Sequence, residues 1–332
     1  MKNVLIVGVG FIGKNHAAAY KSMDDVNIIA AEANKESADA FAEEYGAKVF
    51  PSMEEALESE DIDIIDICLP TFLHEETVLA ALESGKHVML EKPMTLSIES
   101  AERIINAAKS AEGLFMMAQV LRFWPEYAKI KEFIDDGTMG NVSYINMNRL
   151  AQHPNWSPWF RDPTKSGGGL FDLMMHDVDF ANYLFGLPKT AYAVGHKNDL
   201  SAWNDVTASF EFPCGAYGVI ESQFNMTNGY PFSMNIRVMG DKGAADFKFA
   251  AGFNLEDRDS AINSFVLYTA DSDPSEVEIE HPDAYFLELR YFLDCADKGE
   301  KPSVVTPDSS LDSMKMIDAV RRSLESGEKI TL

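Results

Sequence analysis

The sequence predicts an α/β protein with two domains, a doubly wound parallel sheet followed by an α/β domain with a large, open, mostly antiparallel sheet. In residues 1–121, short apolar runs alternate with helical stretches, a pattern typical of parallel sheets. From residue 122 onward, longer alternating runs separated by turn signals favour an antiparallel sheet with one face covered. A chain of 332 residues is long enough to give each domain its own core.

Composition restricts the partners of this chain. A net charge of −25 argues against a nucleic-acid backbone or an anionic membrane surface, because both require basic patches. No segment approaches the roughly 20 apolar residues that span a bilayer. Cys68, Cys214 and Cys295 form no CxxC pair, which indicates neither a disulfide framework nor a zinc site. We therefore expect a cytoplasmic protein.

The first element is a buried strand over residues 3–7, followed by a glycine-rich turn and a helix. The turn has the pattern G-x-G-x-x-G, which is typical of dinucleotide-binding sites in this strand–turn–helix context. The first glycine permits the tight turn, the second allows close approach of a pyrophosphate, and the third lets helix and strand pack. The predicted cofactor contacts here are Gly8, Gly10, Phe11, Ile12 and Gly13.

The same turn also resembles a P-loop, which binds nucleoside triphosphates. A P-loop needs Ser or Thr after its lysine, whereas Asn15 follows Lys14 here. The second strand, Val26–Ala31, ends at Glu32, where a dinucleotide site places an acidic residue for the adenosine ribose. That carboxylate would repel a 2′-phosphate, so NAD is preferred over NADP, although Asn34 and Lys35, which follow immediately, could accommodate a phosphate.

The alternation of strands and helices continues to the end of this domain. Ligands bind beyond the carboxyl ends of parallel strands, and two such ends carry polar residues: the end of strand 63–69 and the end of strand 87–90. Further cofactor contacts are therefore predicted at Leu69, Pro70, Thr71, His74, Glu91 and Lys92. Lys92 precedes a proline, which holds its backbone extended and aims its side chain; the bond could be trans or cis.

The second domain is expected to begin after a strand at 114–121. Its sheet is predicted from strands at 142–150, 191–195, 206–212, 216–224, 232–239, 244–249 and 265–269. A largely apolar helix over 172–185 is the expected cover for one face of that sheet. Helices over 284–296 and 308–325 close the chain.

The predicted helix over 172–185 follows a glycine run at 167–169. At 3.6 residues per turn, Asp172, His176, Asp179 and Tyr183 fall on one stripe of it. Buried Asp and His side chains need partners, so the stripe indicates a structural polar network or an active site. A metal site at Asp172, His176 and Asp179 is a third interpretation; we favour the active site and assign no metal.

These motifs, in this order, resemble those of the Gfo/Idh/MocA family, which includes glucose–fructose oxidoreductase and inositol dehydrogenase. The resemblance rests on the glycine turn, on Glu91-Lys92-Pro93, and on Asp172-x-x-x-His176 after a glycine run. It implies a Rossmann domain, an α/β domain with an open antiparallel sheet, and NAD(P)-dependent oxidation of a sugar or cyclitol hydroxyl. It also implies that Lys92, Asp172 and His176 form the catalytic set. One departure is that Gly169 stands only three residues before Asp172.

Substrate contacts are predicted from residues near these motifs. Aromatic faces with nearby polar groups suit a polyol ring, and the loop before the glycine run provides both. Two further candidates lie at or just after the end of the last strand of the first domain. The predicted substrate contacts are Gln119, Arg122, His153, Trp156, Trp159 and Arg161.

The resemblance leaves two other functions open, an NAD-dependent glycosidase on the same fold and a regulator that binds dinucleotide without turnover. Such a regulator would lack the Lys/Asp/His set, which this chain keeps.

An open sheet has a face that needs covering, so a homodimer or homotetramer formed through the C-terminal sheet is expected.

Overall fold

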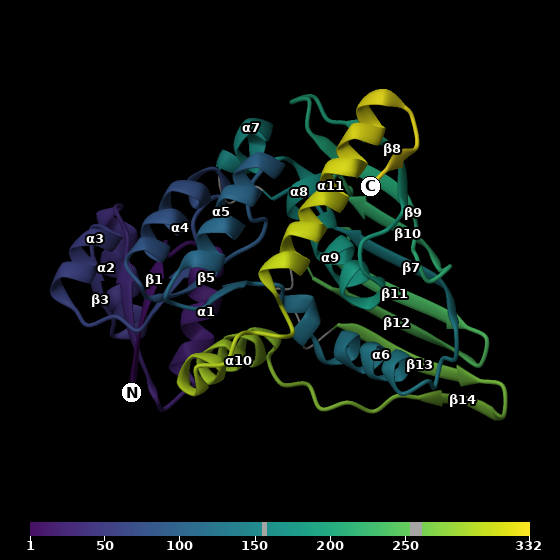
Figure 1. Cartoon of the computed structure of the whole chain (residues 1–332), viewed down its shortest axis with the longest axis horizontal. Helices are drawn as coiled ribbons and strands as arrows, with labels where there is room; N and C mark the ends of the chain where they lie inside the picture. The colour runs from purple at the N-terminus through teal and green to yellow at the C-terminus, as the bar shows by residue number, and fades with distance from the viewer. Residues whose placement is uncertain (155–157, 253–260) are drawn as a thin grey trace. The chain divides into compact units, whose positions relative to one another are not determined.

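The computed structural model describes residues 1–154, 158–252 and 261–332, which form two compact units (Figure 1). Unit 1 comprises residues 1–123 and 282–311, and unit 2 comprises residues 124–281 and 312–332. The boundary at 123/124 lies beside the predicted division at 121/122. The prediction of two continuous domains did not include the return of residues 282–311 to unit 1. That return depends on what helix 284–298 packs against, which its own sequence does not specify.

Unit 1 is built on a six-stranded, wholly parallel sheet in the order β3-β2-β1-β4-β5-β6. Its strands are β1 (Lys2–Val7), β2 (Val26–Ala31), β3 (Lys48–Phe50), β4 (Ile64–Ile67), β5 (His87–Leu90) and β6 (Phe115–Met117). Its helices are α1 (Phe11–Lys21), α2 (Lys35–Tyr45), α3 (Met53–Ser59), α4 (His74–Glu83), α5 (Ile98–Ser110) and α10 (Ala284–Lys298). The strand order reverses between β1 and β4, and ligands of such sheets bind at this reversal.

Unit 2 is built on a nine-stranded sheet in the order β14-β13-β12-β11-β7-β10-β9-β8-β15. The pairings are antiparallel except between β7 and β10, so the predicted fold class is confirmed. Its strands are β7 (Val142–Leu150), β8 (Thr190–Lys197), β9 (Trp203–Glu211), β10 (Tyr217–Gln223), β11 (Phe232–Gly240), β12 (Gly243–Ala251), β13 (Ile262–Thr269), β14 (Ser272–Glu276) and β15 (Ile330–Thr331). Its helices are α6 (Pro125–Asp135), α7 (Pro163–Ser166), α8 (Gly169–Asp172), α9 (Met174–Phe185) and most of α11 (Pro307–Ser326).

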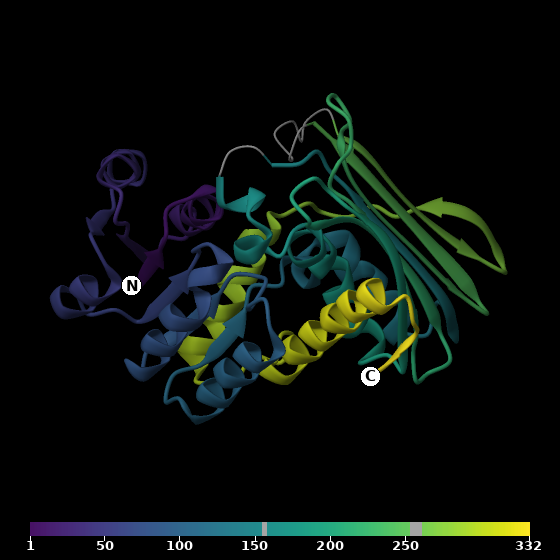
Figure 2. The ribbon, with the colours of Figure 1, turned by 90° about the horizontal axis from the view of Figure 1, so that it is seen from above.

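Helices cover one face of the nine-stranded sheet (Figure 2). Tyr127 of α6 packs edge-on against Phe180 of α9 and Phe247 of β12, with ring centroids 4.9 and 5.8 Å apart. Ser313 of α11 donates a hydrogen bond to Asp179 of α9. These contacts bury alternate residues of the strands, as the period-2 pattern of the sequence predicts.

The opposite face of this sheet carries no helix among the described residues. Strand register places a row of large side chains across it, here called the outer row: Tyr217, Tyr144, Met239 and Tyr268. Tyr217, Met239 and Tyr268 are each more than 40 % exposed, and the Tyr144 and Tyr217 rings lie 4.9 Å apart. Tyr192 and Val194 of β8 are exposed as well.

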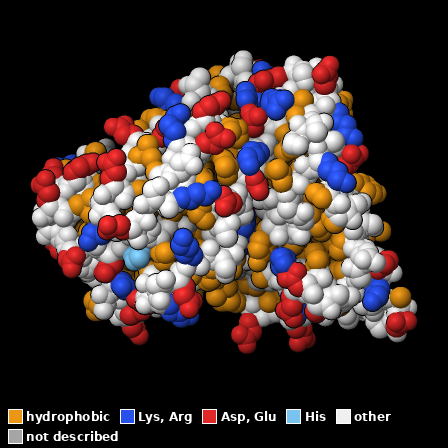
Figure 3. Space-filling view, in the orientation of Figure 1, with side chains coloured by type: hydrophobic (Ala, Val, Ile, Leu, Met, Phe, Trp, Pro, Cys, Tyr) orange, Lys and Arg blue, Asp and Glu red, His pale blue; other side chains and the backbone are white. Residues whose placement is uncertain are grey.

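Acidic side chains dominate the charged surface, but basic side chains are interspersed among them on the face shown in Figure 3. Within the described ranges, no helix is both long enough and apolar enough to cross a lipid bilayer.

Candidate active site

The glycine turn between β1 and α1 is shaped by backbone approach. Gly8 has φ +93°, and a Cβ there would lie 2.9 Å from Leu69 Cδ2. A Cβ on Gly13 would lie 2.1 Å from the Gly8 carbonyl oxygen, so this position admits glycine alone. A Cβ on Gly10 would meet no atom within 4 Å. Gly8 and Gly13 thus serve the fold, whereas the open space beside Gly10 fits close approach of a dinucleotide pyrophosphate.

The helix that follows the turn begins at Phe11, with Gly10 as its N-cap. Phe11 is 49 % exposed and Ile12 is partly exposed, so both side chains lie at the surface of unit 1 beside the turn. The first amides of a helix have no partners within the helix and face anionic groups such as phosphates.

Glu32 lies against the same turn. Its carboxylate accepts hydrogen bonds from the amides of Val9 (3.3 Å) and Asn34 (2.8 Å). The side chains of the two following residues are engaged elsewhere. Asn34 caps α2 by accepting from the Ser37 amide, and the Lys35 ammonium pairs with Asp39 at 3.0 Å.

The ends of β4 and β5 are tied together by His74. This side chain is buried, and its ring nitrogens lie 2.7 Å from the Leu69 carbonyl and 2.9 Å from the Pro93 carbonyl. Burial lowers the pKa of His74, and the two carbonyl contacts oppose that shift. His74 therefore braces the two loops, and its predicted contact with the cofactor stays a prediction. Nearby, Thr71 is buried in a 3₁₀ turn, while Leu69 and Pro70 are partly exposed.

Lys92 follows β5 and is partly exposed, and its peptide bond to Pro93 is cis. The Glu91 carboxylate is buried and accepts a hydrogen bond from the Lys92 amide at 2.9 Å. On its other side, Glu91 Oε1 lies 3.2 Å from His16 Nε2. The sequence interpretation missed this histidine, which lies three residues after Gly13 on the buried side of α1. Its signal was a polar residue within an otherwise apolar helix face.

The glycine run of unit 2 packs against β9. Gly167 and Gly168 have φ of +73° and +71°, and a Cβ on Gly168 would lie 2.9 Å from Ala202 Cβ. The Gly169 amide donates to Asn204 Oδ1 at 3.0 Å. The run therefore permits the backbone turns and the close packing that place the segment beginning at residue 169.

The predicted continuous helix over 172–185 is wrong in one respect, because the chain forms α8 up to Asp172 and α9 from Met174. Leu173 lies between them and serves as N-cap of α9 without a side-chain cap. A run of apolar residues conceals this break, because hydrophobic periodicity continues through it.

Burial separates the members of the polar stripe. In residues 168–182, all of which the structure describes, Asp172 and His176 alone are partly exposed and every other residue is buried. Asp179 is 1 % exposed and accepts from Ser313 Oγ at 2.8 Å. Asp179 thus belongs to the interior network, which argues against a metal site shared with Asp172 and His176.

Asp177 belongs to the interior of unit 2 as well. It forms a bidentate pair with Arg149, with distances of 2.9 and 3.0 Å, and both side chains are buried. Burial raises the pKa of Asp177, and Arg149 opposes that shift.

The predicted substrate residues fall into both units. In unit 1, Gln119 and Arg122 are buried, and the Arg122 guanidinium donates to the Val304 carbonyl at 2.7 Å. In unit 2, Trp159 stacks on Phe160, and Arg161 is exposed. Trp156 lies outside the described residues.

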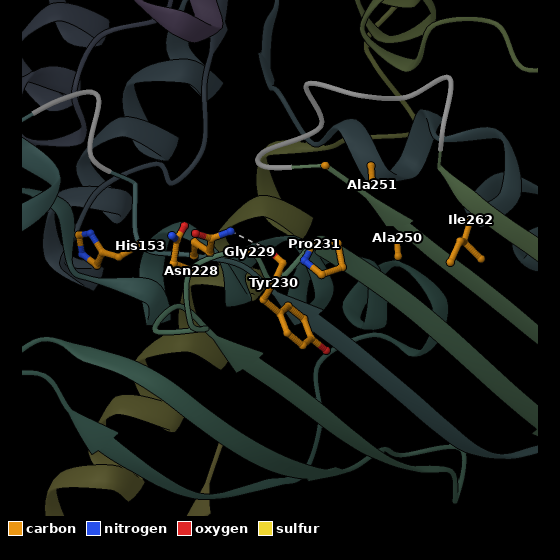
Figure 4. A pocket seen from close by; sticks show the side chains of 10 residues that line it. His153, Asn228, Gly229, Tyr230, Pro231, Ala250, Ala251 and Ile262 are labelled. Atoms are coloured by element: carbon orange, nitrogen blue, oxygen red, sulfur yellow. Dashed lines mark hydrogen bonds between the residues drawn. The ribbon is translucent and has the colours of Figure 1, made fainter.

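His153 lines a cavity of about 540 Å³ within unit 2 (Figure 4). Residues from β12 and β13 line it too, and Gln152 donates to the Tyr230 carbonyl at its wall. Figure 4 shows His153 and Ile262 at opposite ends of the lining. The cavity combines polar and apolar walls, which suits a small polar molecule.

Unit 1 therefore contains the glycine turn, Glu32 and Lys92, and unit 2 contains Asp172 and His176. Within unit 1 the structure brings Glu32 to the glycine turn, and it links the β4 and β5 ends through His74.

Comparison with known proteins agrees with this arrangement. Residues 2–119 match the model of an oxidoreductase family with an NAD-binding Rossmann fold, and residues 127–246 match the GFO/IDH/MocA C-terminal domain. Myo-inositol 2-dehydrogenase of Thermotoga maritima is 28% identical over 98% of this chain and 97% of its own length. Inositol 2-dehydrogenase of Rhizobium meliloti is 27% identical over 98% of each chain.

Solved structures show the same fold. Aldose-aldose oxidoreductase from Caulobacter crescentus, complexed with glycerol, superimposes with a TM-score of 0.86 and 21% identity over 100% of this chain and 99% of that one. Levoglucosan dehydrogenase in complex with NADH and levoglucosan gives a TM-score of 0.84 and 24% identity over 99% of both chains. Family models matching both units, together with relatives matching almost the whole chain, place this protein in the Gfo/Idh/MocA family of NAD-binding oxidoreductases.

Proposed function

We propose that this protein is an NAD-dependent dehydrogenase that transfers a hydride between a secondary hydroxyl of a sugar or cyclitol and nicotinamide. The observation that carries the proposal is the selective exposure of Asp172 and His176 in a stretch that is otherwise buried. Asp177 and Asp179 are buried with partners, as buried carboxylates require, whereas the partial exposure of Asp172 and His176 lets a substrate reach them.

Proton transfer is the task proposed for His176. NAD, when bound, accepts the hydride, and the hydroxyl that loses it must also lose its proton. An imidazole titrates near neutral pH and is suited to take that proton. Lys92 would donate a hydrogen bond to the same oxygen and stabilise its developing negative charge. Asp172 would orient the substrate or the imidazole and support the imidazolium.

NAD is the cofactor that the surroundings of Glu32 support. A carboxylate fixed beside the glycine turn accepts hydrogen bonds from ribose hydroxyls and repels a 2′-phosphate. Lys35, three residues after Glu32, pairs with Asp39, and this pairing competes with binding of a phosphate.

Sugars and cyclitols are the proposed substrates because relatives over the full chain carry the names of inositol dehydrogenases. D-glucoside 3-dehydrogenase of Escherichia coli is a further relative, 27% identical over 73% of this chain and 76% of its own length. Gln119, Arg122, His153, Trp156, Trp159 and Arg161 remain the proposed substrate contacts. The cavity beside His153 would then take part of a polyol or a substituent on it.

Self-association through the outer face of the nine-stranded sheet is also proposed. The outer row exposes Tyr217, Met239 and Tyr268 on a face that no described helix covers, and a second copy would bury them. A cytoplasmic location is proposed as well, supported by three cysteines that are free.

The deciding experiment is a screen of NADH or NADPH formation against sugars and cyclitols, with the reverse reaction tested on their keto forms. We expect turnover with NAD. Replacing Lys92 or His176 by Ala should lower kcat by about 10²–10⁴-fold, the typical contribution of acid–base groups, while NADH fluorescence still reports binding. Near-wild-type turnover in either variant would contradict the assignment.

The same screen separates the other functions. A glycosidase would release the chromophore from a chromogenic glycoside without net NADH, and a non-catalytic regulator would bind NADH and turn over nothing.

A further inference from the structure

A cluster of buried ionisable side chains lies inside unit 1 and includes Glu91, the residue that precedes Lys92. We call it the acid–histidine cluster; its members are His16 of α1, Asp66 of β4, Cys68, Glu91 and Glu288 of α10. His16, Asp66 and Glu288 are 0 % exposed, and Glu91 is 6 % exposed. Burying this many ionisable groups is costly unless they satisfy one another. The dehydrogenase chemistry proposed above uses none of them directly.

His16 lies between two carboxylates. Its Nδ1 is 2.8 Å from Asp66 Oδ2, a hydrogen bond, and its Nε2 is 3.2 Å from Glu91 Oε1, an ion-pair contact with poorer alignment. Burial alone would lower the pKa of His16, but the charge and hydrogen bond of Asp66 oppose burial, and the pKa is raised well above the ordinary value. The raised pKa favours the imidazolium, which carries an N–H on each nitrogen.

Glu288 and two tyrosines complete the surroundings of His16. Burial and the charge of Glu91 raise the pKa of Glu288 well above its ordinary value, which favours its neutral form. The Tyr285 ring, from the same helix, lies 5.6 Å from the imidazole. Burial and the charge of Asp66 raise the pKa of Tyr20 well above its ordinary value, so its phenol is neutral too. Asp66 and Glu91 are the two carboxylates that contact the His16 ring.

Glu91 connects this cluster to the chain at Lys92. One carboxylate oxygen faces His16, and the other accepts from the Lys92 amide at 2.9 Å. The backbone of Glu91 is fixed to β4, since its amide donates to the Ile67 carbonyl at 3.0 Å. The Glu91 carboxylate therefore restrains the Lys92 amide relative to β4.

We propose that His16 is a positioning residue for Lys92, acting through the Glu91 carboxylate that it holds against the Lys92 amide. This proposal rests on the catalytic role proposed for Lys92. A cation anchored by Asp66 fixes Glu91 in one rotamer, and the fixed carboxylate holds the Lys92 backbone. Helix α1, which begins at the glycine turn and carries His16, thereby also supports the segment after β5 that contains Lys92.

The first test compares His16→Gln with Cys68→Ala. Both change the cluster, but only the first removes the contact with Glu91; Cys68 lies 3.5 Å from His16 Nδ1, on the Asp66 side. We expect His16→Gln to fold and to bind NADH normally, with KM unchanged. Its kcat should fall by about 10- to 100-fold, as expected when a catalytic group is displaced by up to about 1 Å. Cys68→Ala should keep the wild-type kcat, and equal losses in both variants would overturn the proposal.

The second test is a double-mutant cycle with Glu91→Gln, which keeps an acceptor for the Lys92 amide but loses the charge that pairs with His16. If His16 acts through Glu91, adding His16→Gln to Glu91→Gln should lower kcat little further. Additive losses would overturn the proposal.

The third test needs no turnover. Hydrogen exchange at the Lys92 amide, followed by mass spectrometry of a peptide covering Glu91–Met94, should quicken in His16→Gln and stay slow in Cys68→Ala. Unchanged exchange in His16→Gln would overturn the proposal. If the wild-type protein oxidised no polyol, the proposed function would fail while this readout still judged the role of His16.

The donor atoms of His16, Asp66 and Cys68 lie within 4.8 Å of one another, so a metal ion is the competing occupant of the cluster. Elemental analysis of the purified protein separates the two. One equivalent of tightly bound metal would overturn the proposal, and its absence after purification without chelator supports a proton on the imidazole.

Discussion

Asp172 ends helix α8 and His176 lies in the first turn of helix α9, and the helix is interrupted at Leu173 between them. Although only four residues separate them, they belong to different helices, and they are the two partly exposed positions in the buried stretch 168–182. The break lets the glycine run fix α8 against β9 while α9 packs on β7 and β10.

Two neighbouring aspartates should respond to substitution in opposite ways. Asp172→Asn should lower kcat strongly and leave the free energy of unfolding near wild type, because Asp172 is partly exposed. Asp177→Asn should destabilise the protein by about 3–5 kcal/mol, because it leaves Arg149 buried without its carboxylate. Urea unfolding and initial rates, measured on both variants, check this. A destabilised Asp172→Asn with unchanged kcat would show the functional and structural roles to be reversed.

The glycine turn offers a similar contrast. Gly13→Ala should destabilise unit 1 by about 1–3 kcal/mol, since its Cβ would lie 2.1 Å from the Gly8 carbonyl. Gly10→Ala should fold normally, because nothing lies within 4 Å of its Cβ, yet weaken NAD binding at least about tenfold, or about 1.4 kcal/mol. Thermal unfolding and NADH fluorescence titration measure both effects. Normal NAD affinity in Gly10→Ala would contradict the proposed contact between the pyrophosphate and Gly10.

Glu32 should control the choice between NAD and NADP. Glu32→Ser removes a carboxylate, and like charges near a protein surface repel by about 1–4 kcal/mol. We expect the ratio of kcat/KM for NAD to that for NADP to fall by about tenfold or more. Lys35→Ala is the matched control and should leave the ratio unchanged, because its ammonium pairs with Asp39. A larger change in the control than in Glu32→Ser would contradict the role of Glu32.

The acid–histidine cluster should make stability depend on pH. The folded-state pKa of His16 is raised, so its contribution is fully present below the unfolded pKa of about 6.5 and is lost as pH rises through the folded pKa. The free energy of unfolding in urea should therefore fall toward alkaline pH in the wild type and fall less in His16→Gln.

Cys68→Ala is the control for that pH dependence. Burial raises the pKa of the Cys68 thiol to about 12, so the thiol does not titrate in this range. The slope in Cys68→Ala should match the wild type. Parallel curves for the wild type and His16→Gln would show that the imidazole does not carry the dependence.

The outer face of the nine-stranded sheet should govern association. Val194→Glu or Tyr217→Glu places a charge among exposed apolar side chains and should shift the protein toward a monomer in sedimentation equilibrium. Leu200 is exposed in the turn between β8 and β9, outside the strands of the sheet, and Leu200→Glu should leave the assembly unchanged. A wild-type protein that sediments as a monomer would contradict the proposed assembly.

The sequence by itself determined the fold class and the order of the motifs. Local chemistry carries this information: apolar runs of strand length, the glycines of the turn at Gly8–Gly13, and turn residues at the ends of strands act over a few positions. The glycine turn, Glu32 at the end of β2 and Lys92 after β5 all stand where the sequence pattern placed them.

The tertiary structure alone decided which polar residues are exposed and which are buried with partners. Helical spacing assigned Asp172, His176 and Asp179 to one stripe, but burial and the Ser313 contact divide them. Likewise, His16, Asp66, Glu91 and Glu288 are scattered over more than 270 positions of the sequence and meet in one cluster. Hydrogen bonds and ion pairs between distant segments depend on packing that no local pattern encodes, so these relationships appear only when the chain is folded.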